Sequence, residues 1–296
     1  MKRPKIVMVG NNKGGVGKTF VSKGLGEYGV LVRKQKVLLL DFDPQTNLSQ
    51  RFVPMRLVRD PGQSDEYVPP LHPDYLTNPG DPEFAGWNGV SDTSDIWMSP
   101  YTVFYPTKYK NLDILPAQSR RLQKIEAVTE EDTFTKVVHR LREFLLHPGI
   151  LDGYDLVIID TRPSKGPLVQ AALHAATHLI IPSQMEPPSV EGLHGMLSVR
   201  VQANLHRPKT DPLKLIGILP NIFRKGATMH EEFLNVFTKN PDVGKYILPV
   251  VVNDWVGYKS SMMYEADSIF NNAPADKHRQ QLEQVFGVIF DRLEAE

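Results

Sequence analysis

Short, uninterrupted apolar runs recur along this chain, and between them apolar residues return every three or four positions. The uninterrupted runs predict buried strands at residues 5–10, 36–43, 112–117, 154–160, 178–183, 213–221 and 246–252. Continuous apolar strands that alternate with helices indicate an α/β fold, with a mainly parallel, twisted sheet and helices on both of its faces.

Helical spacing is clearest in three segments. The first is predicted to run from Lys18 to about Arg33, the second precedes the apolar run at 154–160, and the third is the last helix of the chain. Their predicted inward faces are Val21, Leu25, Tyr28 and Val32, then Phe134, Val137, Val138, Leu141 and Leu145, and finally Leu282, Val285, Phe286, Ile289 and Leu293.

The pattern changes between about residues 52 and 90, where prolines interrupt any regular element. These are Pro54, Pro61, Pro69, Pro70, Pro73, Pro79 and Pro82. We interpret the segment as a long surface insertion, which is either a lid or partner-binding loop or a mobile loop without a role. Because strand–helix units resume after it, residues 1–296 are expected to form a single domain.

Composition narrows the functional classes. Lys plus Arg and Asp plus Glu are equal at 34 each, so any contact with nucleic acid has to come from a local patch. The absence of cysteine excludes disulfides, cysteine-bound zinc, iron–sulfur clusters and a thiol nucleophile, and it is compatible with the cytoplasm. The chain has no run of 18 apolar residues, so we expect neither a transmembrane helix nor a membrane partner.

The stretch NNKGGVGKTF, between the first predicted strand and the first predicted helix, has the features of a phosphate-binding loop. Gly14, Gly15 and Gly17 would allow backbone N–H groups to approach phosphates. Lys18 would neutralise β- and γ-phosphate charge, and Thr19 would ligate magnesium. Strand, loop and helix follow in the order that such a motif requires, which argues against a chance glycine-rich turn.

Two residues of this stretch depart from the strict phosphate-loop pattern. Asn12 stands where the first glycine is expected, and Lys13 is a second lysine in a loop that needs only one. The bland interpretation of Lys13 is an exposed, solubilising side chain.

Carboxylates follow two of the predicted strands. Asp41 and Asp43 are two positions apart at the end of the run at 36–43, so they share a face, and Asp160 ends the run at 154–160. Parallel α/β sheets bind ligands at the carboxyl ends of their strands, and a hydrophobic strand ending in aspartate is typical of a second magnesium-coordinating site. A single aspartate in such a place can also be a helix cap or a loop residue.

The segments KGGVGKT, DFDPQTNLS and YDLVIIDTRPS resemble the deviant Walker A, Walker A′ and Walker B segments of the ParA family, whose members are ATPases that partition plasmids and chromosomes. The similarity continues through LDILPAQ, IIPSQMEPPSVEGL and GILPNIF, and it leaves out residues 52–90. It implies a P-loop NTPase fold of the deviant Walker A class, with ATP and Mg²⁺ as cofactors.

The resemblance also implies roles for individual residues. Lys13 matches the signature lysine, which reaches across a dimer interface to the partner's ATP; an arginine finger that does comparable work contributes ~10³–10⁵ in rate. Asp43 is expected to position or polarise the attacking water, and Asp41 and Asp160 to organise the magnesium environment together with Thr19.

Nucleotide contacts are implied for Gly14, Gly15, Val16, Gly17, Lys18, Thr19, Phe20 and Asn221. The position of Asn221 often meets adenine in this class, although a strand-end asparagine is commonly just a turn or cap residue. Phe20 replaces the usual threonine or serine, so one hydroxyl contact to the α-phosphate is lost while the backbone N–H remains. Arg162 replaces a proline and could touch phosphate, pair with an acid or face a partner.

The implied function is DNA partitioning by a cytoplasmic, nucleoid-associated ATPase. ParA-like homodimers form in the ATP state, bind DNA non-specifically and are released on hydrolysis that a centromere-binding, ParB-like partner stimulates. The DNA contact is salt-sensitive and needs a cluster of Lys and Arg. Candidate cations are Arg200, Arg207, Lys209, Arg224, Lys225, Lys245, Lys259, Lys277 and Arg279.

Four other functions are weighed against this one. A MinD-like membrane-positioning ATPase is expected to end in a basic amphipathic helix, whereas GVIFDRLEAE is acidic. A ParA-like protein that positions a protein cargo and a nucleotide-gated binding module with little turnover both stay open. A metabolic enzyme on the same scaffold is disfavoured, because an iron–sulfur reductase component needs cysteine and a dethiobiotin-synthetase-like ligase lacks the DxDPQ segment.

Overall fold

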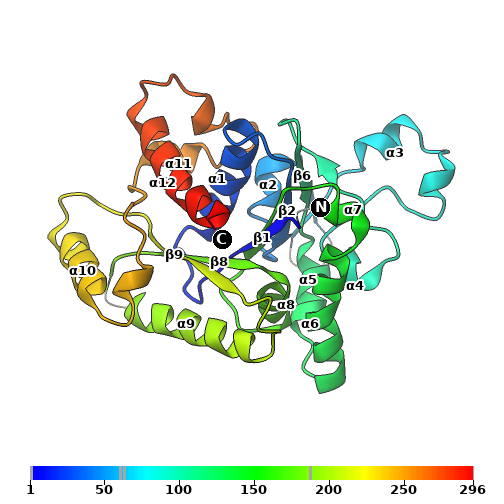
Figure 1. Ribbon diagram of the computed structural model, residues 1–296. Coiled ribbons are helices and arrows are strands. Elements are labelled where there is room, and N and C mark those ends of the chain that lie inside the picture. Colours follow the sequence, from blue (N-terminus) through cyan, green and yellow to red (C-terminus); the bar gives the residue numbers. More distant parts are fainter. Residues whose placement is uncertain (1–2, 60–61, 63–64, 187–188, 296) are drawn as a thin grey trace.

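A seven-stranded sheet forms the centre of the molecule (Figure 1). The computed structural model describes residues 3–59, 62, 65–186 and 189–295. The strands of the sheet are β1 (Lys5–Val9), β2 (Val37–Phe42), β5 (Tyr105–Pro106), β6 (Leu112–Leu115), β7 (Leu156–Thr161), β8 (His178–Ser183) and β9 (Lys214–Pro220). Their order is β5-β6-β2-β7-β1-β8-β9, and within it only the short edge strand β5 runs antiparallel to its neighbour. The predicted mainly parallel sheet is therefore confirmed.

Helices cover both faces of this sheet, as predicted (Figure 1). Side chains alternate along each strand, so Val7 and Val9 of β1 enter one core while Ile6 and Met8 enter the other. The core that contains Val7 is covered by α1 (Lys18–Leu31), α2 (Ser49–Phe52), α11 (Val256–Ser260), η3 (Ile269–Asn271) and α12 (Lys277–Glu294). The opposite core is covered by α4 (Asp95–Met98), α5 (Ser119–Glu126), α6 (Glu131–Leu145), α7 (Pro148–Leu151), α8 (Pro167–Ala175), α9 (Ser189–Leu205) and α10 (Thr228–Lys239).

The first helix ends earlier than its apolar spacing suggests. Val32 was predicted to face the core, but it lies beyond the end of α1 and is 37% exposed. The chain turns through Lys34, which has a left-handed φ of 57°, before it enters β2. The helix therefore stops where the connection to the next strand requires a non-helical backbone.

The run at 246–252 does not form the predicted strand. It begins at the end of η2 (Gly244–Tyr246) and then runs beside β9, joined by isolated hydrogen bonds from Leu248 N to Ile218 O and from Val252 N to Pro220 O, both 2.9 Å long. Four positions of the run, from Leu248 to Val252, lie opposite only two of β9, from Ile218 to Pro220, so the run bulges out of register and no continuous ladder forms.

Residues 52–90 contain short regular elements rather than only irregular loop. They are β3 (Arg56–Val58), β4 (Glu66–Val68), α3 (Pro73–Thr77) and η1 (Pro82–Phe84), with β3 and β4 paired antiparallel. Pro73 and Pro82 begin their helices, because a missing N–H is harmless in the first turn. The prediction that prolines leave this segment without regular elements was therefore wrong. The segment projects beside the edge of the sheet near β6 (Figure 1), and it is tied down where Glu66 accepts a hydrogen bond from the backbone N of Arg120 at 2.8 Å.

Candidate nucleotide-binding site

The glycine-rich loop connects the end of β1 to the start of α1 at the carboxyl edge of the sheet. Gly15 and Gly17 have φ of 74° and 82°, in the left-handed region that favours glycine, and Gly17 is the N-cap of α1. A Cβ at Gly17 would lie 2.3 Å from Nδ2 of Asn221, so only glycine fits here. Asn11 holds the other end of the loop, because its Nδ2 donates to Pro182 O at 2.8 Å and its Oδ1 accepts from Lys13 N at 2.9 Å.

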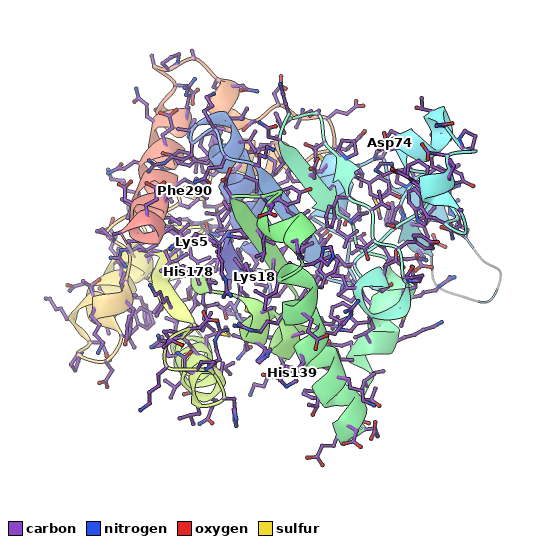
Figure 2. All side chains as sticks on the ribbon, turned by 45° about the vertical axis from the view of Figure 1, so that its right-hand side comes forward. Lys5, Lys18, Asp74, His139, His178 and Phe290 are labelled. Carbon is purple, nitrogen blue, oxygen red and sulfur yellow. The ribbon has the colours of Figure 1, made fainter. Side chains whose placement is uncertain are left out.

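Lys18 points into this loop from the first turn of α1, near the centre of the molecule in Figure 2. Its Nζ donates to the backbone oxygens of Asn11 at 3.2 Å and Lys13 at 3.1 Å, and the residue is only 7% exposed. Burial lowers the pKa of the ammonium, and the nearby carboxylates of Asp160 and Asp43 oppose that shift. A phosphate in the loop would give the ammonium a charged acceptor in place of the backbone oxygens.

Asp41 and Asp160 lie side by side at the ends of β2 and β7, where they form a register pair, and both are fully buried. Oδ2 of Asp41 accepts from Ser49 N at 2.8 Å and from Ser49 Oγ at 2.6 Å. Oδ1 of Asp160 accepts from Ser22 Oγ at 2.8 Å, whereas its Oδ2 is buried without a hydrogen-bond partner. Burial raises the pKa of both carboxyls, and the proximity of the pair adds to the rise at Asp160.

The closeness of these two carboxylates is unfavourable by itself and favours a bound divalent cation. A buried carboxylate oxygen without a partner is costly, and a cation or its bound water would satisfy Asp160 Oδ2. The hydroxyl of Thr19 also faces Asp160, whose pKa it lowers. Among the described residues no group of three or more His, Asp or Glu side chains is placed to hold a metal, so a cation here would need the hydroxyl, water and ligand oxygens as well.

Asp43 and Lys13 flank the loop at more exposed positions. Asp43 is half-buried; its N donates to Asp41 Oδ1 at 3.1 Å, and its own Oδ1 accepts from Gln45 N at 3.0 Å. Nζ of Lys13 lies 3.5 Å from Oε2 of Glu186 in the same chain, and these two side chains are 27% and 31% exposed. The second lysine is thus held by a carboxylate of its own subunit.

Two adjoining hollows open beside the loop. The loop hollow, of about 480 Å³, is lined by Gly14, Gly15, Gly17, Lys18, Thr19, Phe20, Asp43, Asn47, Arg51, Pro163, Lys259 and Met262. The apolar pocket, of about 160 Å³, is lined by Gly17, Phe20, Asn221, Ile222, Val252, Asn253, Asp254, Trp255, Tyr258, Lys259 and Met262. Phe20 lies between them with its ring 5.2 Å from that of Tyr258. The pair of hollows can take a polyphosphate in the first and a flat ring system in the second.

Asn221 joins the loop to β9. It is 1% exposed, its Nδ2 donates to Val16 O at 2.8 Å, and its N donates to Ser183 O at 2.8 Å. Val16 is itself fully buried. The side chain of Asn221 therefore supports the loop in addition to lining the apolar pocket, and its contact with a base stays a prediction.

Comparison with known proteins identifies the family. A family model described as an AAA domain matches residues 4–209. A ParA family protein of Chlamydia trachomatis is 30% identical over 235 residues, which make up 79% of this chain and 78% of that protein. The chain belongs to the ParA family. The resemblance of the three motifs to this family is thereby confirmed.

Two further matches agree with this membership. The sporulation initiation inhibitor protein Soj of Bacillus subtilis is 32% identical over 195 residues, and the match spans 66% of this chain but only 64% of Soj. A plasmid partition protein of Borrelia burgdorferi, solved bound to AMPPNP, has a TM-score of 0.67 and 18% identity, with 99% of both chains covered. At this identity the second likeness shows the fold, which is that of a P-loop NTPase.

Not all the cations considered for DNA contact are available in this ParA-family chain. Arg207 is 7% exposed, and its guanidinium donates to the backbone oxygens of Leu173, His174 and Ala176. Arg207 has a structural role, and its prediction as a DNA contact was wrong. Other members of the set are engaged in ion pairs at the surface: Arg224 and Lys259 with Asp254, and Arg279 with Glu283.

Several residues of the site lie outside the sequence motifs. Trp255, Tyr258 and Lys259 come from a segment more than 200 positions after the glycine-rich loop, and Lys259 was considered only as a DNA contact. Arg51 follows the DFDPQTNLS motif by two positions, and this closeness is the one local signal that could have identified it as a residue of the site. Arg162 forms no ion pair with an acid of the described residues, so one of its three predicted options is removed.

Membrane-spanning helices were not expected, and none of the helices in the described ranges is long and apolar enough to cross a bilayer.

Proposed function

We propose that this ParA-family chain is an ATPase that partitions DNA. The observation that carries the proposal is the grouping of Lys18, Asp41, Asp43 and Asp160 around one glycine-rich loop, with an unpartnered buried oxygen on Asp160. The plasmid partition protein of Borrelia burgdorferi that shares this fold was solved with the ATP analogue AMPPNP. We also propose that residues 1–296 form one ATPase domain, with residues 52–90 as an insertion in it.

The loop hollow would hold the phosphates. Backbone N–H groups from Gly14 to Phe20 would donate to phosphate oxygens, since they lie at the N-terminus of α1. Lys18 would exchange its bonds to Asn11 O and Lys13 O for bonds to the β- and γ-phosphates. The base would enter the apolar pocket, next to Asn221 and against Phe20 and Tyr258.

The magnesium ion would be held by the hydroxyl of Thr19. Carboxylate oxygens of Asp41 and Asp160 would also hold it, either directly or through water that they orient. When bound, Mg²⁺ offsets the charge that develops on the phosphates during transfer. Its positive charge would also lower the raised pKa of the two buried carboxyls, because a nearby cation favours the ionised form. Asp43 faces the loop hollow from a less buried position, and we assign it the positioning of the attacking water.

Lys13 would link nucleotide binding to dimer formation. In the structure it pairs with Glu186 of its own chain, so a role in trans requires this contact to be exchanged for the phosphates held by a second copy. Both side chains are partly exposed, which makes the exchange inexpensive. The ATP-state homodimer would then bind DNA non-specifically in the cytoplasm, at the nucleoid, and a centromere-binding ParB-like partner would stimulate hydrolysis and release.

The decisive experiment measures DNA binding with ATP, ADP and AMPPNP across a range of salt concentrations, for the wild type and for Lys13→Ala. We expect tight, salt-sensitive binding only with the triphosphates, with a slope in log–log form of about −0.9 per phosphate contacted. Light scattering should show a dimer of the wild type with AMPPNP and a monomer of Lys13→Ala. Lys124→Ala, an exposed lysine on α5, is the matched control and should behave as the wild type.

Two outcomes would count against the proposal. Equal DNA binding with ADP and AMPPNP would remove the nucleotide switch. An AMPPNP-dependent dimer of Lys13→Ala with the mass of the wild-type dimer would remove the role in trans.

A further inference from the structure

Arg51 is a cation at the loop hollow that the three nucleotide motifs do not include. It lies in α2, whose start is bound to the end of β2 through the two hydrogen bonds from Ser49 to Asp41. Phe52, the next residue, is 7% exposed and packs in the same core as α1. The backbone of Arg51 is therefore fixed on both sides, and its side chain lines the hollow together with Lys18 and Thr19.

Within the described ranges no carboxylate forms an ion pair with the guanidinium of Arg51, and its buried Nε makes no hydrogen bond. The part-buried arginines Arg120, Arg121 and Arg142 each have a carboxylate partner. Arg162, Arg200 and Arg292 are also part-buried and form no ion pair within the described ranges, but unlike Arg51 they do not line the loop hollow. Burial without a partner also lowers the pKa of Arg51. A half-buried guanidinium without an anion is unfavourable unless an anion arrives with a ligand.

The position of Arg51 in the fold indicates which part of a nucleotide it meets. The apolar pocket lies on the β9 side of the loop, where Asn221 follows the end of that strand. Arg51 follows β2, which is on the other side of β1 in the strand order, and it does not line that pocket. Its neighbours around the loop hollow include Gly14, Gly15 and Asp43. A nucleotide that places its base against Tyr258 would therefore present phosphate, not base, to Arg51.

We propose that Arg51 binds the polyphosphate of the nucleotide held in the same subunit and so adds a second cation, besides Lys18, to the phosphate site. The inference rests on the proposed nucleotide function of this loop. A planar guanidinium suits this task, because it can donate two parallel hydrogen bonds to a phosphate, and Arg and Lys are not interchangeable for that geometry.

The test compares the binding of AMPPNP, ADP and adenosine to the full chain with Mg²⁺ by isothermal titration calorimetry. Arg51→Met should weaken AMPPNP and ADP binding by about 10-fold or more, which corresponds to about 1.4 kcal/mol, and leave adenosine binding within about twofold. Arg51→Lys should recover only part of the loss. Arg56→Met, an exposed arginine on β3, is the matched control and should bind all three ligands as the wild type does.

Thermal unfolding without nucleotide provides a second readout. Because Arg51 has no partner to lose, Arg51→Met should not lower the melting temperature of the nucleotide-free chain. A clear fall in that temperature would indicate a structural role and would overturn the inference, as would unchanged AMPPNP and ADP affinity or an equal loss for adenosine. If the wild type itself bound neither AMPPNP nor ADP, the proposed function would fail instead, so the two failures are distinguishable.

Discussion

The replacement Gly17→Ala probes the most constrained point of the nucleotide loop. Gly17 combines a left-handed backbone with a neighbour, Nδ2 of Asn221, only 2.3 Å from where a Cβ would stand. Gly15 is a built-in comparison, because its φ of 74° is similar while nothing lies within 4 Å of its Cβ position. The two alanine variants therefore share backbone strain and differ in the clash.

The magnitudes follow from these two terms. An alanine in the left-handed region costs about 1–2 kcal/mol, which is the whole effect expected for Gly15→Ala. In Gly17→Ala the amide of Asn221 must also move, which breaks its buried bond to Val16 O and adds about 1–3 kcal/mol. We expect Gly17→Ala to lower the free energy of unfolding by about 2–5 kcal/mol in total, from the sum of these two ranges.

A double-mutant cycle with Asn221→Ala separates strain from clash. Asn221→Ala removes the amide, so the added methyl of Gly17→Ala then meets only Ile222 Cδ1 at an ordinary contact distance of 3.8 Å, and the same hydrogen bond cannot be lost twice. The double variant should therefore be more stable than the sum of the single effects predicts, by about 1–3 kcal/mol. Gly15→Ala and Asn221→Ala should be additive.

Urea unfolding followed by circular dichroism measures these free energies, provided that the slope m is unchanged between variants. Binding of AMPPNP, measured in parallel, would detect strain that the loop absorbs locally. The reasoning is refuted if Gly17→Ala is no more destabilised than Gly15→Ala, or if the effects of Gly17→Ala and Asn221→Ala simply add.

Two further predictions concern catalysis and acid stability. Asp43→Ala should slow ATP hydrolysis at least about 100-fold, the lower end of the range for losing a positioned acid–base group, while the AMPPNP-dependent dimer in light scattering persists. Loss of the dimer as well would show that Asp43 acts on assembly. Burial, with the charges of His139, Arg142 and Arg207, lowers the pKa of His174 to about 4, so the neutral ring stabilises the fold above pH 6.5 and this contribution is lost as the pH falls towards 4. After a discount for the partial exposure of the ring, this contribution is about 1 kcal/mol at pH 5. Between pH 7.5 and pH 5.0 the unfolding free energy of His174→Gln should therefore fall by about 1 kcal/mol less than that of the wild type or of His206→Gln, the exposed-histidine control. Equal falls in all three proteins would contradict the assignment.

Local sequence patterns were sufficient to predict strands β1, β2, β6, β7, β8 and β9 and the ends of the nucleotide loop. The run at 178–183 matches β8 residue for residue, because a continuous apolar run can be buried on both sides only in the middle of a covered sheet. Asp41 and Asp160 could be placed at one edge from their positions at strand ends alone, and they are register partners in β2 and β7. Their closeness follows from the common direction of parallel strands.

Other features depend on which segments the fold brings together. The run at 246–252 has the apolar character of a strand, but it follows the η2 turn and bulges out of register with β9, so it keeps only isolated bonds to that strand. Arg207 looks like a surface cation in the sequence, yet it is buried because the carbonyls at the end of α8 converge on it. A charge pattern does not reveal such acceptors, since they come from another part of the chain.

The residues that line the site show the same difference between features set by local sequence and features set by the fold. The loop from Gly14 to Thr19 is readable as a motif, because its chemistry lies in consecutive residues. Tyr258 meets Phe20 only because α11 packs over the start of α1, and Arg51 meets the loop only because β2 lies next to β7 and β7 next to β1 in the sheet. Consecutive residues can specify a phosphate loop, but the groups that close it from other segments are set by strand order and helix packing, which are properties of the folded chain.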